Sequence, residues 1–217
     1  MNSRYINTIL ILIVATVFSV CFIDRSLALW IYSQHFNTRG FIHLISEGLP
    51  YFVFVIMLII LALSRSISLP KVRVLSFQIQ RFALLLWFIL CLELSTLVKT
   101  VLKVIFGRYW PATWTNHNLS LLHDQVYGFN WLHGFANQGS FPSGHSTFIA
   151  YCCGLLILVQ PKLTILWISI ILLVVFALVI QNYHFLGDCL AGVSLGMLCA
   201  YLAWRSFNSV CNGQIKP

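Results

Sequence analysis

Residues 163–180 read LTILWISIILLVVFALVI and contain no charged side chain. A helix needs about 17–25 predominantly apolar residues to cross the hydrocarbon core of a bilayer, so this stretch predicts a transmembrane helix. Outward along the chain, five more windows have a similar character: 6–23, 44–63, 82–102, 143–159 and 185–204. The sequence therefore predicts an all-α polytopic membrane protein, with six transmembrane helices in one bundle and a single domain over residues 1–217.

The composition supports a lipid environment. Hydrophobic residues make up 59% of the chain and charged residues only 8%, whereas soluble domains carry about 25% charged residues. The net charge of +8 does not indicate nucleic-acid binding, because the basic residues form no stripe and lie between apolar runs. Six of the seven cysteines lie in apolar runs, where cysteine acts as a small hydrophobic residue, so neither a disulfide nor a thiolate metal site is expected.

The first apolar window has an alternative interpretation as a signal peptide, with Arg4 as its charged flank. A small-x-small cleavage site should follow such a peptide. The sequence after the window, Phe22-Ile23-Asp24-Arg25, does not provide one. We therefore expect a retained helix.

Lysine and arginine predict the orientation, because cytoplasmic loops carry an excess of both. With the N- and C-termini in the cytoplasm, the inner side holds eight of the 13 basic residues: Arg4, Arg65, Lys71, Arg73, Arg81, Lys162, Arg205 and Lys216. The seven histidines then all lie at the outer side. Histidine is the side chain best suited to chemistry near neutral pH, so the outer face is expected to be the working face.

The segment Pro142-Ser143-Gly144-His145-Ser146 stands directly before an apolar run and reads as a helix start. The N–H groups at a helix start favour phosphate, and glycine lets a ligand approach the backbone. Ser143 and Gly144 are therefore candidate phosphate ligands, and His145 is placed to protonate a leaving oxygen. The alternative is an ordinary helix cap with a histidine at the membrane interface.

In the segment His184-Phe-Leu-Gly-Asp188, the two ionisable residues are four apart and would share one face of a helix. A carboxylate that accepts one ring N–H leaves the other nitrogen free to attack phosphorus. The alternative is an ion pair that anchors the sixth helix.

A third segment places Lys103 and Arg108 on the outer side, against the charge bias, with Gly107 at a turn. These two cations indicate an anion to bind, or alternatively contact with lipid headgroups.

Together these segments resemble the type-2 phosphatidic acid phosphatase family of six-helix membrane lipid phosphatases. The family pattern is K-x6-R-P, then P-S-G-H, then S-R-x5-H-x3-D, and the resemblance covers about residues 99–204. It implies that His184 is the nucleophile, Asp188 its orienting acid and His145 the general acid, with the phosphate held by Lys103, Ser143 and Gly144 and without any metal or other cofactor. The compact form also implies a bacterial inner membrane with a periplasmic active site.

Two motif arginines are absent, because Trp110 and Leu178 stand at their positions. A hydrogen bond to a charged group contributes about 1.5–3 kcal/mol, so phosphate binding must be compensated or activity reduced. Arg108, Gln181 and Asn182 are the expected compensating residues.

Three functions remain open at this stage. The first is hydrolysis of a lipid phosphate or diphosphate. The second is transfer of the same phosphoryl group to another lipid. The third is lipid binding or transport by an inactive member of the family, and a transporter places polar groups at mid-membrane, where Glu93 is the only clear case.

Overall fold

The computed structural model describes residues 2–36, 40–63, 77–114, 117–133 and 139–213. This part of the chain is helical and has no extended strand, only isolated bridges. In the N-terminal half, three segments run on into one another: α1 (Asn2–Phe18), the π-helix η1 (Ser19–Ile23) and α2 (Asp24–Ser33). They are followed by α3 (Phe41–Leu63) and α4 (Phe77–Phe106). The C-terminal half contains α5 (Leu121–Asp124), α6 (Gly144–Val159), the 3-10 turn η2 (Pro161–Leu163), α7 (Thr164–Ile180) and α8 (Leu186–Gly213).

Five of these helices are long and apolar enough to cross a membrane: Ser3–Ser33, Phe41–Leu63, Gln78–Phe106, Pro161–Ile180 and Leu186–Ser209. The sixth predicted window corresponds to α6, a shorter apolar helix. The all-α membrane bundle expected from the sequence is thus confirmed. Four basic residues used to predict the orientation, Arg65, Lys71, Arg73 and Lys216, lie outside the described residues.

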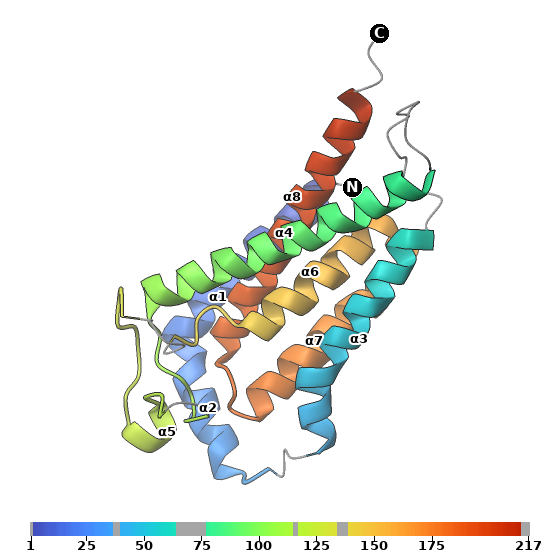
Figure 1. Cartoon of the computed structure of the whole chain (residues 1–217). Coiled ribbons are helices and arrows are strands. Elements are labelled where there is room, and N and C mark those ends of the chain that lie inside the picture. Colours follow the sequence, from blue (N-terminus) through green and yellow to red (C-terminus); the bar gives the residue numbers. More distant parts are fainter. Residues whose placement is uncertain (1, 37–39, 64–76, 115–116, 134–138, 214–217) are drawn as a thin grey trace.

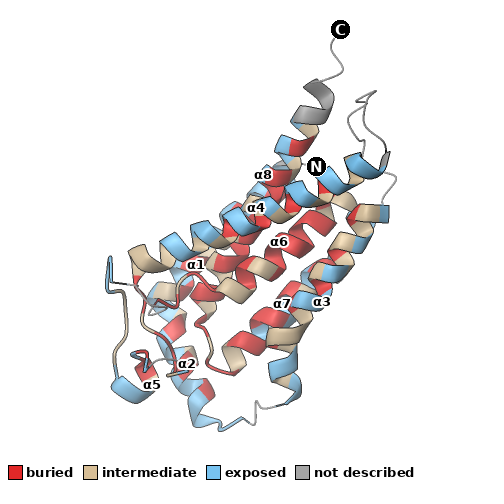
Figure 2. Cartoon of the chain, viewed as in Figure 1, coloured by how far each residue is buried: buried red, intermediate tan, exposed pale blue. Residues whose placement is uncertain are grey.

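The short helix α6 is the centre of the bundle. Eleven of its 16 residues are buried, around its whole circumference, and it packs against α3, α4, α7 and α8. Figure 2 shows it as a nearly continuous buried ribbon between helices whose outer faces are exposed. A helix that is apolar on all sides is expected in such a position, because neighbours cover every face.

Two glycines on α8 set its distance from α6. A Cβ on Gly192 would lie 2.5 Å from the carbonyl oxygen of Ser143, and one on Gly196 would overlap the carbonyl of Thr147. Small residues four apart let membrane helices approach backbone to backbone. This close contact fixes the start of α8 beside the start of α6, which are the two places where the sequence predicts catalytic residues.

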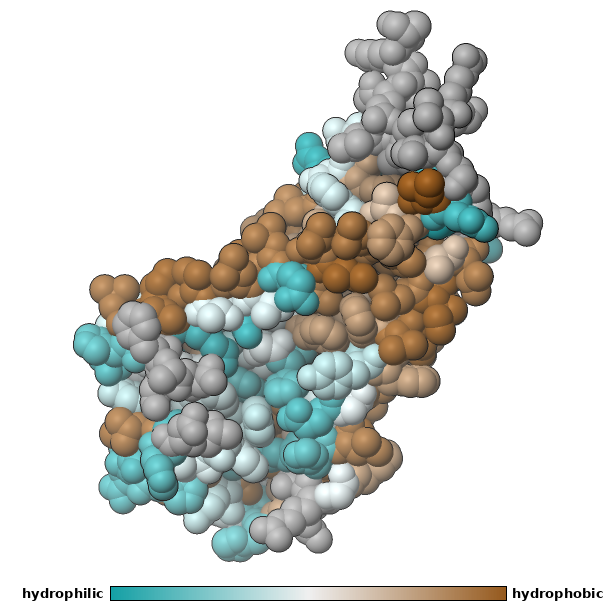
Figure 3. Space-filling model, viewed as in Figure 1, coloured by the Kyte–Doolittle hydropathy of each residue, from teal (hydrophilic) through white to brown (hydrophobic). Residues whose placement is uncertain are grey.

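The molecule has an apolar helical part and a polar end. The helices carry exposed hydrophobic side chains such as Leu10, Val14 and Leu172. Figure 3 shows a largely hydrophobic surface over the helical part of the molecule. Hydrophilic residues gather at the end where the segment from 107 to 143 lies (Figures 1 and 3), and both chain ends lie toward the opposite end. Aromatic contacts order the described part of this segment, for example Phe106 with Phe129 and Phe141.

Candidate active site

A cavity of about 300 Å³ opens among α3, α4, α6 and the turn that precedes α8. Its wall includes four residues predicted from the sequence, Lys103, Gly144, His145 and His184. The other predicted residues do not line it: Ser143, Arg108, Asp188, Gln181 and Asn182. The cavity therefore brings together the proposed nucleophile, general acid and one cation from three separate segments.

His184 lies in the tight turn between α7 and α8. The turn reverses at Asn182, whose φ of 51° is left-handed, a conformation that asparagine tolerates better than most residues. The backbone N–H groups of Tyr183 and His184 both point at the carbonyl of Leu178. Because α8 begins only at Leu186, the expectation that His184 and Asp188 share a helix face needs correction: Asp188 is helical and His184 precedes the helix.

The two side chains nevertheless face each other. Nδ1 of His184 lies 3.5 Å from Oδ2 of Asp188, and both side chains are almost fully buried. This distance is long for a hydrogen bond, and Nδ1 has no other partner. Catalytic hydrogen bonds are often long without substrate and shorten when it binds. Asp188 is itself held by the backbone N–H of Phe185, 3.1 Å from Oδ2.

Burial shapes the protonation of His184. Desolvation in its buried site lowers the pKa of the imidazole to about 4, and this effect outweighs the opposing hydrogen bond and charge of Asp188. The ring is therefore neutral at pH 7, which is the form that a nucleophile requires.

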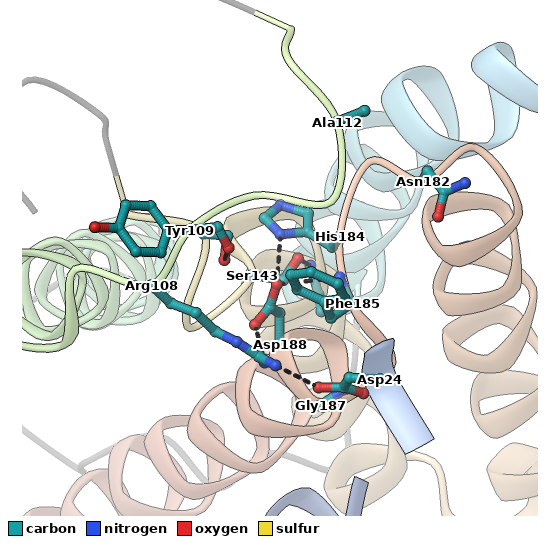
Figure 4. A network of polar contacts seen from close by, with 12 residues as sticks. Asp24, Arg108, Tyr109, Ala112, Ser143, Asn182, His184, Phe185, Gly187 and Asp188 are labelled. Atoms are coloured by element: carbon teal, nitrogen blue, oxygen red, sulfur yellow. Dashed lines mark hydrogen bonds and ion pairs between the residues drawn. The ribbon is translucent and has the colours of Figure 1, made fainter. Parts of the chain in front are cut away.

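Arg108 occupies a different place from the one expected. Its guanidinium is fully buried, with Nη1 2.6 Å from Oδ1 of Asp188 and Nη2 2.7 Å from Oδ2 of Asp24, as Figure 4 shows. The prediction that Arg108 binds the substrate phosphate, directly or by swinging toward the position of Trp110, is not supported by this arrangement. Both terminal nitrogens already hold carboxylates, and releasing them would leave two buried charges uncompensated.

Asp24 is a site residue that the sequence reasoning missed. It follows the π-helix Ser19–Ile23 and is 1% exposed. Its Oδ1 accepts hydrogen bonds from the hydroxyl of Ser19 (2.6 Å) and the N–H of Gly187 (2.9 Å). A π-helical turn inside an α-helix often marks a functional site. The available signal was an acidic residue at the end of an apolar run, in a chain with only five acidic residues.

Ser143 is the N-cap of α6. Its side chain accepts a hydrogen bond from the N–H of Ser146 at 3.3 Å, and its own N–H donates to the carbonyl of Asp188 at 3.0 Å. Ser143 is fully buried, so the helix-cap alternative describes its observed contacts. Gly144, one residue later, does reach the cavity wall.

His145 has a carboxylate partner that the sequence reasoning also missed. Its Nε2 lies 3.1 Å from Oε2 of Glu47 on α3, and both side chains are about a quarter to a third exposed, at 25% and 33%. Glu47 appeared in the sequence only as an interruption of the second apolar window. The carboxylate holds the imidazole in place at the cavity wall.

Trp110, at the position of one missing arginine, forms part of the cavity wall. Its ring centroid lies 5.0 Å from the His184 ring and 4.8 Å from the ammonium nitrogen of Lys103. The indole thus lies close to both the cation and the proposed nucleophile. An uncharged ring therefore lines the cavity at the position where the family pattern has a charged arginine.

The second substituted position, Leu178, is buried in the apolar core. Gln181 and Asn182 do not compensate for it in this structure, since they line a separate cavity of about 420 Å³. The Gln181 amide donates to Ser46 and to the carbonyl of Ala177, and the Asn182 amide donates to the carbonyl of Ala28. Among the described residues, no group of three or more His, Cys, Asp or Glu side chains is placed to hold a metal ion.

Comparisons with known proteins give one family match and one match in fold. The family model described as PAP2 superfamily matches residues 84–210. A crystal structure of a transmembrane PAP2 type phosphatidylglycerolphosphate phosphatase from Bacillus subtilis has a similar fold, with a TM-score of 0.50 and 20% sequence identity over 99% of this chain and 96% of that chain. No curated protein matches the sequence. The family match contains every cavity-lining catalytic candidate and excludes Asp24 and Glu47.

Proposed function

This chain belongs to the PAP2 superfamily, and from that premise we propose that it is a metal-independent phosphatase that removes a phosphate or diphosphate from a membrane lipid. The observation that carries the proposal is the cavity in which His184, His145 and Lys103 meet, with Asp188 directly behind His184. These are the groups needed for nucleophilic attack, protonation of a leaving group and charge stabilisation.

The proposed reaction has two steps. In the first, the free Nε2 of His184 forms a bond to phosphorus while the bond from phosphorus to the leaving oxygen breaks, and His145 gives its proton to that oxygen. Asp188 stabilises the positive charge that develops on the His184 ring through Nδ1. In the second, His145 takes a proton from water, the water oxygen bonds to phosphorus, and the bond between phosphorus and Nε2 breaks to release phosphate and restore His184.

The residues behind the cavity have a positioning role in this scheme. Arg108 fixes one oxygen of Asp188, so the other oxygen is directed toward His184. Asp24 in turn fixes Arg108 and joins it to the start of α8 through Gly187. A bifurcated arginine between two carboxylates is more rigid than a single pair, because the planar fork fixes both directions.

The proposed location is a bacterial inner membrane, with the cavity at the periplasmic face and both termini in the cytoplasm. The charge bias supports this orientation, and both chain ends lie opposite the end that holds the segment from 107 to 143 (Figure 1). Reporter fusions after residue 204 and within residues 117–130 should report opposite sides of the membrane. If both report the same side, the proposed orientation fails.

The decisive test is phosphate release by purified protein in detergent from phosphatidate, phosphatidylglycerophosphate, a polyprenyl diphosphate and lipid A phosphate. We expect release from at least one lipid in excess chelator, inhibition by vanadate, and no release by a His184→Ala variant. A phosphorylated acceptor lipid in place of free phosphate would identify a phosphotransferase. Binding without any turnover would identify an inactive lipid-binding protein. The transport alternative has little support, since Glu93 is exposed on α4 and does not line the cavity.

A further inference from the structure

A second lysine lies in the same cavity as Lys103. Thr96, Lys99 and Lys103 follow one another on one face of α4 and all line the cavity. The ammonium nitrogen of Lys99 lies 3.6 Å from the point that a Cβ on Gly144 would occupy. It is therefore at the first residue of α6 and next to His145 in the chain.

The surroundings of Lys99 leave its charge unbalanced. Across the described ranges, neither Lys99 nor Lys103 forms a salt bridge with a carboxylate, and both are half-buried. Glu47 contacts His145, which lines the cavity, and is not itself a lining residue. Two lysines one helical turn apart repel each other, and the start of α6 adds partial positive charge. Such an arrangement is unfavourable until an anion enters the cavity.

The two lysines mark opposite sides of that anion. Lys103 packs on Trp110, whose ring in turn packs on His184, so Lys103 belongs to the nucleophile side. Lys99 lies by Gly144 and His145, the side of the general acid. In phosphoryl transfer the attacking and leaving oxygens lie roughly in line on opposite sides of phosphorus, which puts Lys99 by the leaving group.

We propose that Lys99 is a phosphate-binding residue that contacts the leaving-group side of the substrate and supplies part of the charge lost with the two motif arginines. This inference rests on the proposed phosphatase function. It also makes Lys99 a specificity determinant. An alcohol leaving group needs only the proton from His145, whereas a phosphate leaving group carries negative charge that Lys99 is placed to neutralise.

The test compares two substrates with one lipid chain, farnesyl monophosphate and farnesyl diphosphate. Lys99→Gln should lower kcat/KM by about 30-fold or more for the diphosphate and by about fivefold or less for the monophosphate. Lys103→Gln should lower both by similar factors. Lys162→Gln is the matched control, because Lys162 is an exposed lysine between α6 and α7. It follows the C-terminal end of α6, whereas the cavity lies at the N-terminal end of that helix. Equal losses on both substrates for Lys99→Gln, or losses no larger than for Lys162→Gln, would overturn the proposal.

A binding measurement separates this proposal from the proposed function. Methylenediphosphonate, which cannot be hydrolysed, should raise the Tm of the detergent-solubilised wild type, and Lys99→Gln should lose most of that shift but keep the smaller shift caused by inorganic phosphate. If the wild type releases no phosphate from any lipid and this pattern is still observed, the phosphatase proposal fails and the Lys99 site stands. If Lys99→Gln keeps the full diphosphonate shift, the Lys99 site fails whatever the activity.

Discussion

Two groups of charged residues flank His184, and they differ in whether each charged group contacts one of opposite charge. Behind the histidine is the buried network of Asp24, Arg108 and Asp188, where both carboxylates contact the guanidinium and all three side chains are 0–1% exposed. In front is the cavity wall of α4, where Lys99 and Lys103 are half-buried without a carboxylate partner among the described residues.

This difference indicates a separate role for each group. A buried network of close contacts between opposite charges holds geometry, because any movement breaks strong contacts. Cations without counter-ions in a cavity provide a field for a ligand that brings its own negative charge. In the proposed reaction, the buried network therefore fixes His184, and the cavity wall binds the phosphate that His184 attacks.

The largest expected effect comes from His184, where the two groups meet. His184→Ala should lower turnover by at least about 10,000-fold and abolish the covalent phosphoenzyme, because the attacking atom is gone. Rapid-quench labelling with a radiolabelled lipid phosphate measures both. His145→Ala is the control: it should slow phosphoenzyme formation and be partly rescued by a p-nitrophenyl ester, whose leaving group needs no proton. Rescue of both variants to the same degree would contradict their separate roles.

The next effect tests the buried network through stability. Arg108→Ala leaves Asp24 and Asp188 as unpaired buried carboxylates, so the free energy of unfolding should fall by about 3–5 kcal/mol. Thermal unfolding in detergent measures this change. Arg108→Lys should recover little, because one ammonium cannot span two carboxylates as the guanidinium does. Adding Asp24→Asn to Arg108→Ala should restore part of the loss; a further loss of stability would show that Asp24 is not balanced by Arg108.

The pH dependence of the first step tests the burial of His184. With a pKa of about 4, its imidazole stays mostly neutral down to pH 5. For an ordinary histidine, with a pKa of about 6.5, the neutral fraction would fall about 30-fold by pH 5. Protonation removes the nucleophile, so the rate of phosphoenzyme formation should fall only as the pH approaches 4. A p-nitrophenyl ester isolates this step from His145. An acid limb centred near pH 6.5 would show that His184 is solvated in the working enzyme.

The smallest effect concerns Trp110 in the cavity wall. Trp110→Arg adds a charged hydrogen-bond donor, a gain of about 1.5–3 kcal/mol, but removes the aromatic ring that packs on His184 and Lys103. We expect a net change within about tenfold in kcat/KM. The same substitution should have a larger favourable effect in the Lys99→Gln background, because the added charge replaces a lost one and the two effects are not additive. Equal effects in both backgrounds would mean that the two positions contact different parts of the substrate.

The membrane bundle and the candidate catalytic residues at the cavity were accessible to sequence reasoning for a simple reason. In a lipid solvent a spanning helix must be apolar over its whole length, so the helices stand out as windows and the functional residues as polar interruptions at their ends. His184, His145, Lys103 and Gly144 are such interruptions, and the structure places all four at one cavity. The family pattern added their expected roles.

The directions of individual side chains were decided by the tertiary structure. Arg108 contacts Asp24 across 84 positions of sequence and Asp188 across 80, and no local pattern indicates such a pairing. Lys99 lies within the apolar window 82–102 of the sequence, and only the packing of the helices places Gly144 beside it. Gly192 and Gly196 likewise let the backbone of α8 pack closely on α6. Apolarity along the chain therefore determined which segments enter the membrane, and backbone contact between helices decided which charges meet.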